Sequence, residues 1–307
     1  MPFRRGLPEW TTLLVLVSVW GSSFALTKIA VQTIPPIWVP ALRLVLAAVL
    51  LAAVMAVRRI SWPRGANNWL WLAWFAVIGN IMPFFMISWA TQHVASSLAG
   101  ILMAVNPLLV LVLSRLLLPD EPVRLSNVIG FLIGFAGVVM LIGPAALLQL
   151  GDAGIELAAQ FALILAAFGY ASMNVSARLA PKMGLIPLSA GTMFVAALMA
   201  LAAAIIHDPN GLVGVSTSSA TAVLLLALFP TTLATLCLYW LVARAGSRFL
   251  AMSNYAVPVF AILVGWFFLH ERLDAGDLAG FALICLGLAI SESRLLEIVL
   301  RQRPEER

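Results

Sequence analysis

Apolar runs of about twenty residues recur from one end of the chain to the other, and they restrict the possible folds more than any other feature. The hydrocarbon layer of a bilayer is about 30 Å thick, and about 20 apolar residues cross it as a helix. Only 10% of the 307 residues are charged, whereas an ordinary soluble domain carries roughly 25%. Barrel strands would alternate apolar and polar residues, and these runs do not. The sequence therefore predicts an all-α polytopic membrane protein.

Charged residues, proline and glycine divide the apolar sequence into ten runs. We expect ten transmembrane helices, near residues 11–31, 36–57, 68–90, 96–118, 125–147, 156–180, 185–206, 219–244, 247–269 and 275–296. Ten crossings bring both termini to the same side of the membrane.

The positive residues give this fold an orientation. All but three of the 18 Lys and Arg residues lie on the side of the two termini. Lys28 and Arg272 lie on the opposite side, and Arg43 lies within a span. The positive-inside rule therefore predicts cytoplasmic termini, in a bacterial-type cytoplasmic (inner) membrane. Because the basic residues are scattered over short loops, the net charge of +5 does not indicate a nucleic-acid partner.

The sequence repeats itself at about half its length. A shift of 151 residues superposes Pro36 on Pro187, Trp89 on Trp240, Ser96 on Ser247 and Pro107 on Pro258. Each half, 1–150 and 151–307, holds five predicted spans, and this odd number forces the second half to enter the membrane from the opposite side. We therefore predict one integral membrane domain built from two inverted five-helix repeats. This is the usual architecture of alternating-access carriers.

Three motifs occur once in each half. They are WGSSF at 20–24 and FGYAS at 168–172, a proline followed by a glutamate (Pro107 and Glu121, Pro258 and Glu271), and GFLIGFAG at 130–137 and GFALICLG at 280–287. Together they resemble the drug/metabolite transporter superfamily, and within it the EamA-type ten-helix carriers and the YddG-type exporters of aromatic and other neutral amino acids. The resemblance covers essentially the whole chain. It implies a pore lined by helices 1 to 4 and 6 to 9, with helices 5 and 10 at the periphery.

Arg43 is the strongest single pointer to a binding site. An arginine at the centre of a membrane helix costs about 2.5 to 3.5 kcal/mol on insertion scales. Arg43 lies roughly 10 Å along its helix from Pro36. It either snorkels outward or bonds backbone carbonyls at a broken helix, or it offers a fixed cation to the carboxylate of an amino acid. Lys28 lies within one turn of a helix end, so we expect it to snorkel.

Other polar and aromatic residues within the spans are candidates for the pathway. The predicted substrate-binding residues are Trp20, Ser23, Arg43, Asn80, Met82, Met86, Trp89, Asn106, Tyr170, Asn174, Tyr239 and Asn254. The Met and aromatic residues of this set could instead contact lipid or another helix. Gly21 and Ser22 lie beside Ser23, and for them the alternative to lining the pathway is helix packing. Prolines within the spans remove a backbone donor and free a carbonyl, so the predicted hinges are Pro83, Pro107, Pro230 and Pro258.

The spans hold few titratable residues, and this narrows the range of transport mechanisms. All thirteen acids and the three histidines lie in loops, tails or span ends, so coupling through a buried titratable group is not expected. No metal, cofactor or disulfide is indicated, since Cys237 and Cys285 lie in apolar runs without a nearby histidine. We therefore predict a facilitator that exports neutral amino acids by alternating access, with a small molecule and the lipid bilayer as its partners and a monomer as a state that fits this architecture.

Two alternatives remain beside this prediction. One is a drug or other metabolite carrier of the same superfamily. The other is a polytopic membrane enzyme, which is disfavoured because a long loop such as HDPNGLVGVSTSS carries only His207 and Asp208 as titratable groups. We expect that the protein is not an enzyme.

Overall fold

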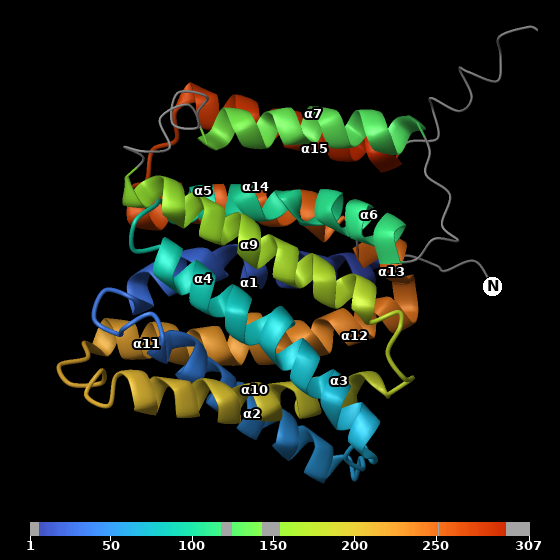
Figure 1. Cartoon of the computed structure of the whole chain (residues 1–307), viewed down its shortest axis with the longest axis vertical. Helices are drawn as coiled ribbons and strands as arrows, with labels where there is room; N and C mark the ends of the chain where they lie inside the picture. Colours follow the sequence, from blue (N-terminus) through green and yellow to red (C-terminus); the bar gives the residue numbers. More distant parts are fainter. Residues whose placement is uncertain (1–5, 118–124, 143–153, 251, 293–307) are drawn as a thin grey trace, which may run out of the picture.

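The computed structural model describes residues 6–117, 125–142, 154–250 and 252–292, which form helices and their connections (Figure 1). In chain order the helices are α1 (Leu7–Ala30), α2 (Trp38–Val57), α3 (Ala66–Ala76), α4 (Met82–Ala90), α5 (Ser96–Leu102), α6 (Asn106–Leu117), α7 (Leu125–Ile142), α9 (Ile155–Ser176), α10 (Leu185–His207), α11 (Thr217–Leu226), α12 (Ala234–Ala245), α13 (Ser247–Leu250), α14 (Ser253–Leu269) and α15 (Ala275–Glu292). Three irregular turns interrupt them: the π-turns η1 (Val77–Ile81) and η3 (Ala227–Leu233), and the 3₁₀ turn η2 (Met103–Val105).

The predicted spans coincide with apolar helical segments. Within the described residues, seven segments are long and apolar enough to cross a membrane: Leu7–Ala30, Trp38–Val57, Ala66–Ala90, Ser96–Leu117, Ile155–Ser176, Leu185–His207 and Thr217–Ala245. The shorter apolar helices Leu125–Leu141, Ala256–Leu269 and Ala275–Ser291 occupy the other three predicted spans. The predicted all-α polytopic fold is therefore confirmed. The predicted boundary between 150 and 151, and Glu121, lie outside the described residues.

Helices of the two halves pack against each other as an approximate two-fold arrangement. The pairs α2–α10 and α7–α15 each join equivalent helices of the two halves and lie at opposite edges of the molecule (Figure 1). Between them, α1 packs against α14 and against α11 and α12. Its counterpart α9 packs against α6 and against α4. Because each contact recurs with the halves exchanged, the sequence repeat is also a structural repeat.

Glycines bring α7 and α15 into close contact at the edge of the bundle. A Cβ atom at Gly130 would meet the carbonyl oxygen of Gly287, and one at Gly137 would meet that of Gly280. Only glycine allows backbones to approach this closely, which is a common way for membrane helices to associate. The glycine-rich motifs at 130–137 and 280–287 therefore pack these two helices together.

The third and eighth spans are broken by π-turns at equivalent positions. Pro230 has no N–H for the carbonyl of Leu226, and the Thr231 hydroxyl donates to that carbonyl instead, at 2.8 Å. In η1, Asn80 Nδ2 donates to the carbonyl of Phe75 at 3.0 Å. The shift of 151 residues that relates the halves places Asn80 on Thr231. Both turns therefore carry a polar side chain bonded five residues back, and both face the centre of the bundle.

Candidate functional site

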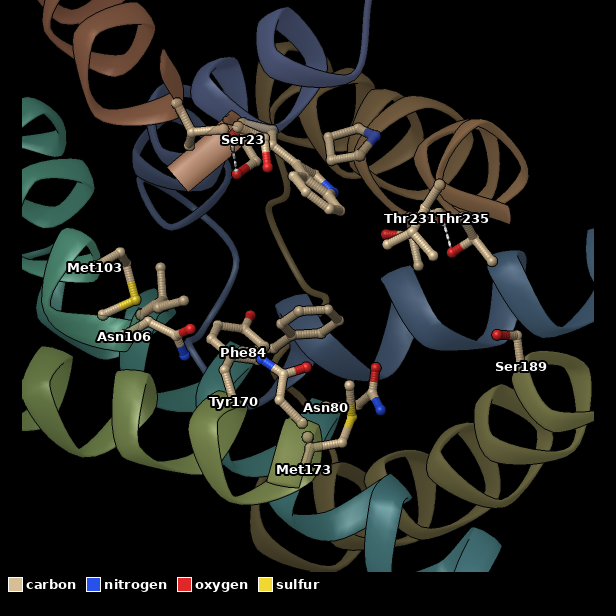
Figure 2. Close-up of a pocket in the computed structure, with 18 of the residues that line it drawn as sticks. Ser23, Asn80, Phe84, Met103, Asn106, Tyr170, Met173, Ser189, Thr231 and Thr235 are labelled. Atoms are coloured by element: carbon tan, nitrogen blue, oxygen red, sulfur yellow. Dashed lines mark hydrogen bonds between the residues drawn. The ribbon is translucent and has the colours of Figure 1, made fainter. Parts of the chain in front are cut away.

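A cavity of about 480 Å³ lies between the two halves (Figure 2). Its described lining comes from spans 1 to 4 and 6 to 9, and no residue of α7 or α15 belongs to it. This is the arrangement that the resemblance to ten-helix carriers implied. The volume falls within the range of about 300 to 1,000 Å³ that is typical of small-molecule sites.

Most of the predicted substrate-binding residues line this cavity. They are Trp20, Ser23, Arg43, Asn80, Asn106, Tyr170, Asn174, Tyr239 and Asn254, together with the prolines Pro230 and Pro258. Figure 2 shows Ser23 and Thr231 facing Asn106, Tyr170 and Asn80 across the open space. That these residues contact a substrate stays a prediction, as does a hinge role for the prolines.

The structure places Met82, Met86 and Trp89 outside the cavity lining. The cavity face of this span carries Asn80, Phe84 and Ile87, which follow helical spacing and form one stripe. The other three residues are therefore turned away from it: Met82 lies against Gly169 of α9, and Met86 and Trp89 pack against a buried apolar cluster. Composition could not reveal this, because it does not fix the rotation of a helix.

Pro83 and Pro107 also lie outside the cavity lining. Pro83 is the second residue of α4, which follows the π-turn η1 directly, and it lies close to Gly169. Pro107 lies in the first turn of α6, just after the 3₁₀ turn η2. Both prolines thus stand at a break in their span, where a missing N–H is tolerated.

Arg43 points into the cavity. Its side chain is only 8% exposed, its Nε donates to Thr231 Oγ1 at 2.6 Å, and its guanidinium carbon lies 3.9 Å from the ring centroid of Phe84. It neither snorkels to a surface nor bonds a backbone carbonyl, so the first interpretation of this residue is wrong. No carboxylate among the described residues pairs with it, and neither terminal Nη group has a hydrogen-bond partner there.

The other polar groups of the lining are neutral. The side-chain amide nitrogens of Asn80 and Asn106 donate to the carbonyls of Phe75 and Ala167, each at 3.0 Å. Each amide oxygen is thereby left as an acceptor that faces a cavity with no Asp, Glu or His in its described lining.

Several lining residues escaped the sequence reasoning. They are Phe84, Met103, Met173, Ser189, Thr192, Thr231, Thr235 and Ser253. For Thr231 a signal existed, because the shift of 151 residues places it on Asn80. The same shift places Met103 on Asn254, which was a signal for Met103. For the remaining residues no such signal existed, since Ser, Thr, Met and Phe are common on membrane helices.

Near the lining residues Thr27 and Gly100 lies a polar cluster that we call the Glu271 cluster: Glu271, Lys28, Ser96 and Ser97. The Glu271 carboxylate accepts the backbone N–H groups of Ser96 at 2.7 Å and Ser97 at 2.9 Å, and also both serine hydroxyls. Lys28 Nζ lies 3.3 Å from Glu271 Oε1 and donates to the carbonyl of Val94 at 2.9 Å. Lys28 is therefore paired, with a side chain that is 33% exposed, and that it snorkels stays a prediction.

A sharp turn brings Glu271 back over the end of α14. His270 adopts the left-handed conformation, with φ of 54°, and the Glu271 N–H donates to the carbonyl of Gly265 at 3.1 Å. A Cβ atom at Gly265 would collide with Glu271 Oε2, so glycine leaves room for the carboxylate. Burial raises the pKa of Glu271, but the hydrogen bonds from Ser96 and Ser97 outweigh it and hold the pKa below its usual value. The carboxylate is therefore ionised.

The opposite end of the cavity, which we call the Asn254 end, is open. Asn174 and Ala177, at the end of α9, belong to the lining and are exposed. At the Glu271 end α14 packs against α5, whereas farther along the same span α6 packs against α9. The fourth and ninth spans thus meet at one end and diverge toward the other.

Comparison with known proteins identifies the fold and its family. The sequence profile described as the EamA-like transporter family matches residues 9–143 and 157–292, once for each half. A WAT1-related chloroplastic protein of Arabidopsis thaliana is 26% identical, over 91% of this chain and 68% of its own length. An uncharacterized transporter of Archaeoglobus fulgidus is 24% identical, over 92% of this chain and 98% of its own.

Two further similarities are more limited. The uncharacterized inner membrane transporter YedA of Escherichia coli is 32% identical, over 46% of this chain and 45% of its own length. A solved crystal structure superposes with a TM-score of 0.65 over 94% of this chain and 98% of its own, at 21% identity, and shows the shared fold alone.

Proposed function

This chain belongs to the EamA-like transporter family of the drug/metabolite transporter superfamily, and from that premise we propose that it exports neutral amino acids, aromatic ones included, across a bacterial-type inner membrane. It is a multi-pass membrane transporter. The proposal concerns which substrate the transporter carries, in which direction it carries it, and what drives the transport.

The observation that carries the proposal is the free guanidinium edge of Arg43 in a cavity without a described acid. A buried cation strongly favours an anionic ligand, and arginine pairs well with carboxylates. The substrate ammonium group would meet the amide oxygens of Asn80 and Asn106, which are acceptors. A neutral zwitterion therefore offers a carboxylate to the Arg43 guanidinium and an ammonium group to the amide oxygens. A cationic drug would bring a second positive charge next to Arg43 with no lining carboxylate to balance it.

The apolar part of the lining suits an apolar side chain. Trp20, Phe24, Ile87, Met103 and Val257 line the cavity beside the polar groups. Burying the side chain of a Phe or Met substrate there is favourable by about 1.5 to 3 kcal/mol relative to water. This supports aromatic and larger aliphatic amino acids within the neutral class.

Two further features support export that is driven by the substrate gradient alone. The described lining offers no Asp, Glu or His that could carry a proton, which supports transport down the substrate gradient. The positive-inside rule assigns the Asn254 end to the cytoplasm, so the open cavity would load from inside. Alternating access then requires the Glu271 cluster to separate when the substrate leaves on the other side.

Uptake into liposomes tests this proposal. Labelled phenylalanine, threonine and methionine are offered to the purified protein without any ion gradient, and the native chain is compared with Arg43→Ala. We expect native uptake and at least about tenfold less with Arg43→Ala, because a charge-assisted hydrogen bond contributes roughly 1.5 to 3 kcal/mol. Arg58→Ala is the matched control, since Arg58 lies at the end of the same helix and outside the cavity lining.

Two results would contradict the proposal. Equal uptake by Arg43→Ala and the native chain would exclude a carboxylate held by Arg43. Transport that occurs only under an imposed pH gradient would exclude a facilitator.

A further inference from the structure

We propose that Thr231 is a positioning residue, which turns the Arg43 guanidinium so that a substrate carboxylate can bind only end-on, to the two terminal Nη groups. This inference rests on the proposed function, because it concerns how a carboxylate would be held in that cavity. It adds a residue and a binding geometry that the charge of Arg43 alone does not specify.

The first step is the π-turn that fixes the Thr231 hydroxyl. Pro230 leaves the carbonyl of Leu226 without its helical donor, and Thr231 Oγ1 donates its single proton there at 2.8 Å. The hydroxyl can therefore only accept from Arg43, whose Nε lies at 2.6 Å. Thr231 is 3% exposed, so its hydroxyl is largely shielded from bulk water.

The second step is the orientation of the guanidinium plane. Phe84 lies beneath it, with 3.9 Å between the guanidinium carbon and the ring centroid, and such stacking suits a planar cation. An arginine can meet a carboxylate either along its Nε–Nη edge or along its Nη–Nη edge. Thr231 occupies Nε, so only the Nη–Nη edge remains, and it has no hydrogen-bond partner among the described residues.

The third step is a comparison with the equivalent turn of the other half. The shift of 151 residues places Asn80 on Thr231 and Phe194 on Arg43. Phe194 is 40% exposed and contacts the rings of Trp62 and Trp69, so the position equivalent to Arg43 offers no cation to the turn that carries Asn80. The two halves thus supply one carboxylate-binding group and not two, and a substrate has one orientation in the cavity.

The test compares two neighbouring hydroxyls of the same π-turn. Thr231→Val removes the hydroxyl that holds Arg43. The matched control is Thr232→Val, because Thr232 Oγ1 donates in the same way to the carbonyl of Ala227 at 2.9 Å but does not line the cavity. Thr231→Ser keeps the hydroxyl and is the rescue variant. If the Thr231→Val protein cannot be purified in a folded state, Thr231→Ala is measured in its place.

We measure KM and the maximal rate for phenylalanine uptake into liposomes, and inhibition by phenylalaninamide, which lacks the carboxylate. For Thr231→Val we expect KM to rise about tenfold, because one hydrogen bond to a charged group is lost, while the maximal rate changes less than about twofold. The preference for phenylalanine over its amide falls in parallel. Thr231→Ser and Thr232→Val should keep both values within about twofold of native.

Three other results would overturn the inference, and one of them would also contradict the proposed function. If Thr232→Val raises KM as much as Thr231→Val does, the hydroxyls support the turn and not Arg43, and the inference is overturned. If Thr231→Val keeps the native KM while Arg43→Ala loses transport, the inference fails and the proposed function stands. If Arg43→Ala also keeps native transport, the proposed function fails with it.

Discussion

The two ends of the cavity differ in how the helices around them are joined. At the Glu271 end, one carboxylate from the loop after α14 ties the start of α5 through four hydrogen bonds and also meets Lys28 of α1. At the Asn254 end, the ion pair between Arg244 and Glu9 joins α12 to α1. The helices pack against each other at both ends, but the Glu271 carboxylate has several partners on two helices, whereas Glu9 meets another helix through a single arginine.

This difference shows where a conformational change would have to act. The Glu271 side chain is 8% exposed, and its partners Lys28, Ser96 and Ser97 all belong to the first half, so the cluster joins the two halves. Hydrogen bonds to a charged group contribute roughly 1.5 to 3 kcal/mol each, so separating this cluster is costly unless new contacts form. The Arg244–Glu9 pair has a 60% exposed arginine and contributes little by comparison. Changes at the Glu271 cluster should therefore have larger effects than changes at the Arg244–Glu9 pair.

The largest effect is expected for Glu271→Ala. This change leaves Lys28 and the backbone N–H groups of Ser96 and Ser97 without their acceptor, so the closed end should open more often. In a chain with Ser23→Cys as the only cysteine, we expect labelling of intact cells by a membrane-impermeant maleimide to rise about tenfold. Glu9→Ala is the control, because it removes a buried carboxylate with a cationic partner at the other end. Unchanged labelling by Glu271→Ala would mean that the cluster does not close the pathway.

An intermediate effect is expected for Gly265→Ala. The added methyl group would collide with Glu271 Oε2, so the carboxylate must shift while its charge and its turn remain. Maleimide labelling at position 23 should rise by a factor of about two to five, since part of the hydrogen bonding is retained. Gly154→Ala serves as the control, because nothing lies within 4 Å of a Cβ atom there. Labelling that falls below the native rate would contradict a tight fit at Gly265.

The smallest effect is expected for a change of pH. Contact with Ser96 and Ser97 lowers the pKa of Glu271 in the closed state, so the stabilisation is present above the usual carboxyl range and is lost only as pH falls through the lowered value. Maleimide reacts with the thiolate, so labelling at position 23 is expressed relative to that of a free thiol at the same pH, and this ratio should be the same at pH 8 and pH 6. A clear increase at pH 6 would mean that another group titrates at this end.

Much of the architecture could be read from the sequence, because the bilayer imposes a length and a polarity on every span. The runs near 36–57 and 185–206 were found as spans from apolarity alone, and each is now a single helix, α2 and α10. The repeat followed from matched prolines such as Pro107 and Pro258. Arg43 stood out because a cation inside a span is rare, and it does reach the cavity.

Other features depend on where neighbouring helices lie. Met82 and Asn80 are two residues apart, yet only Asn80 faces the cavity, because the packing of α4 against α9 fixes the rotation of the span. The pairing of Lys28 with Glu271 joins two residues far apart in the chain, and no local pattern predicts it.

Hydrophobicity and charge are properties of short segments, so the sequence by itself determined the all-α polytopic fold and the presence of one cation within a span. The direction in which a side chain points, and the partner it meets, depend on contacts between segments. Only the tertiary structure therefore decided that Thr231 holds Arg43 and that Glu271 joins α5 and α1.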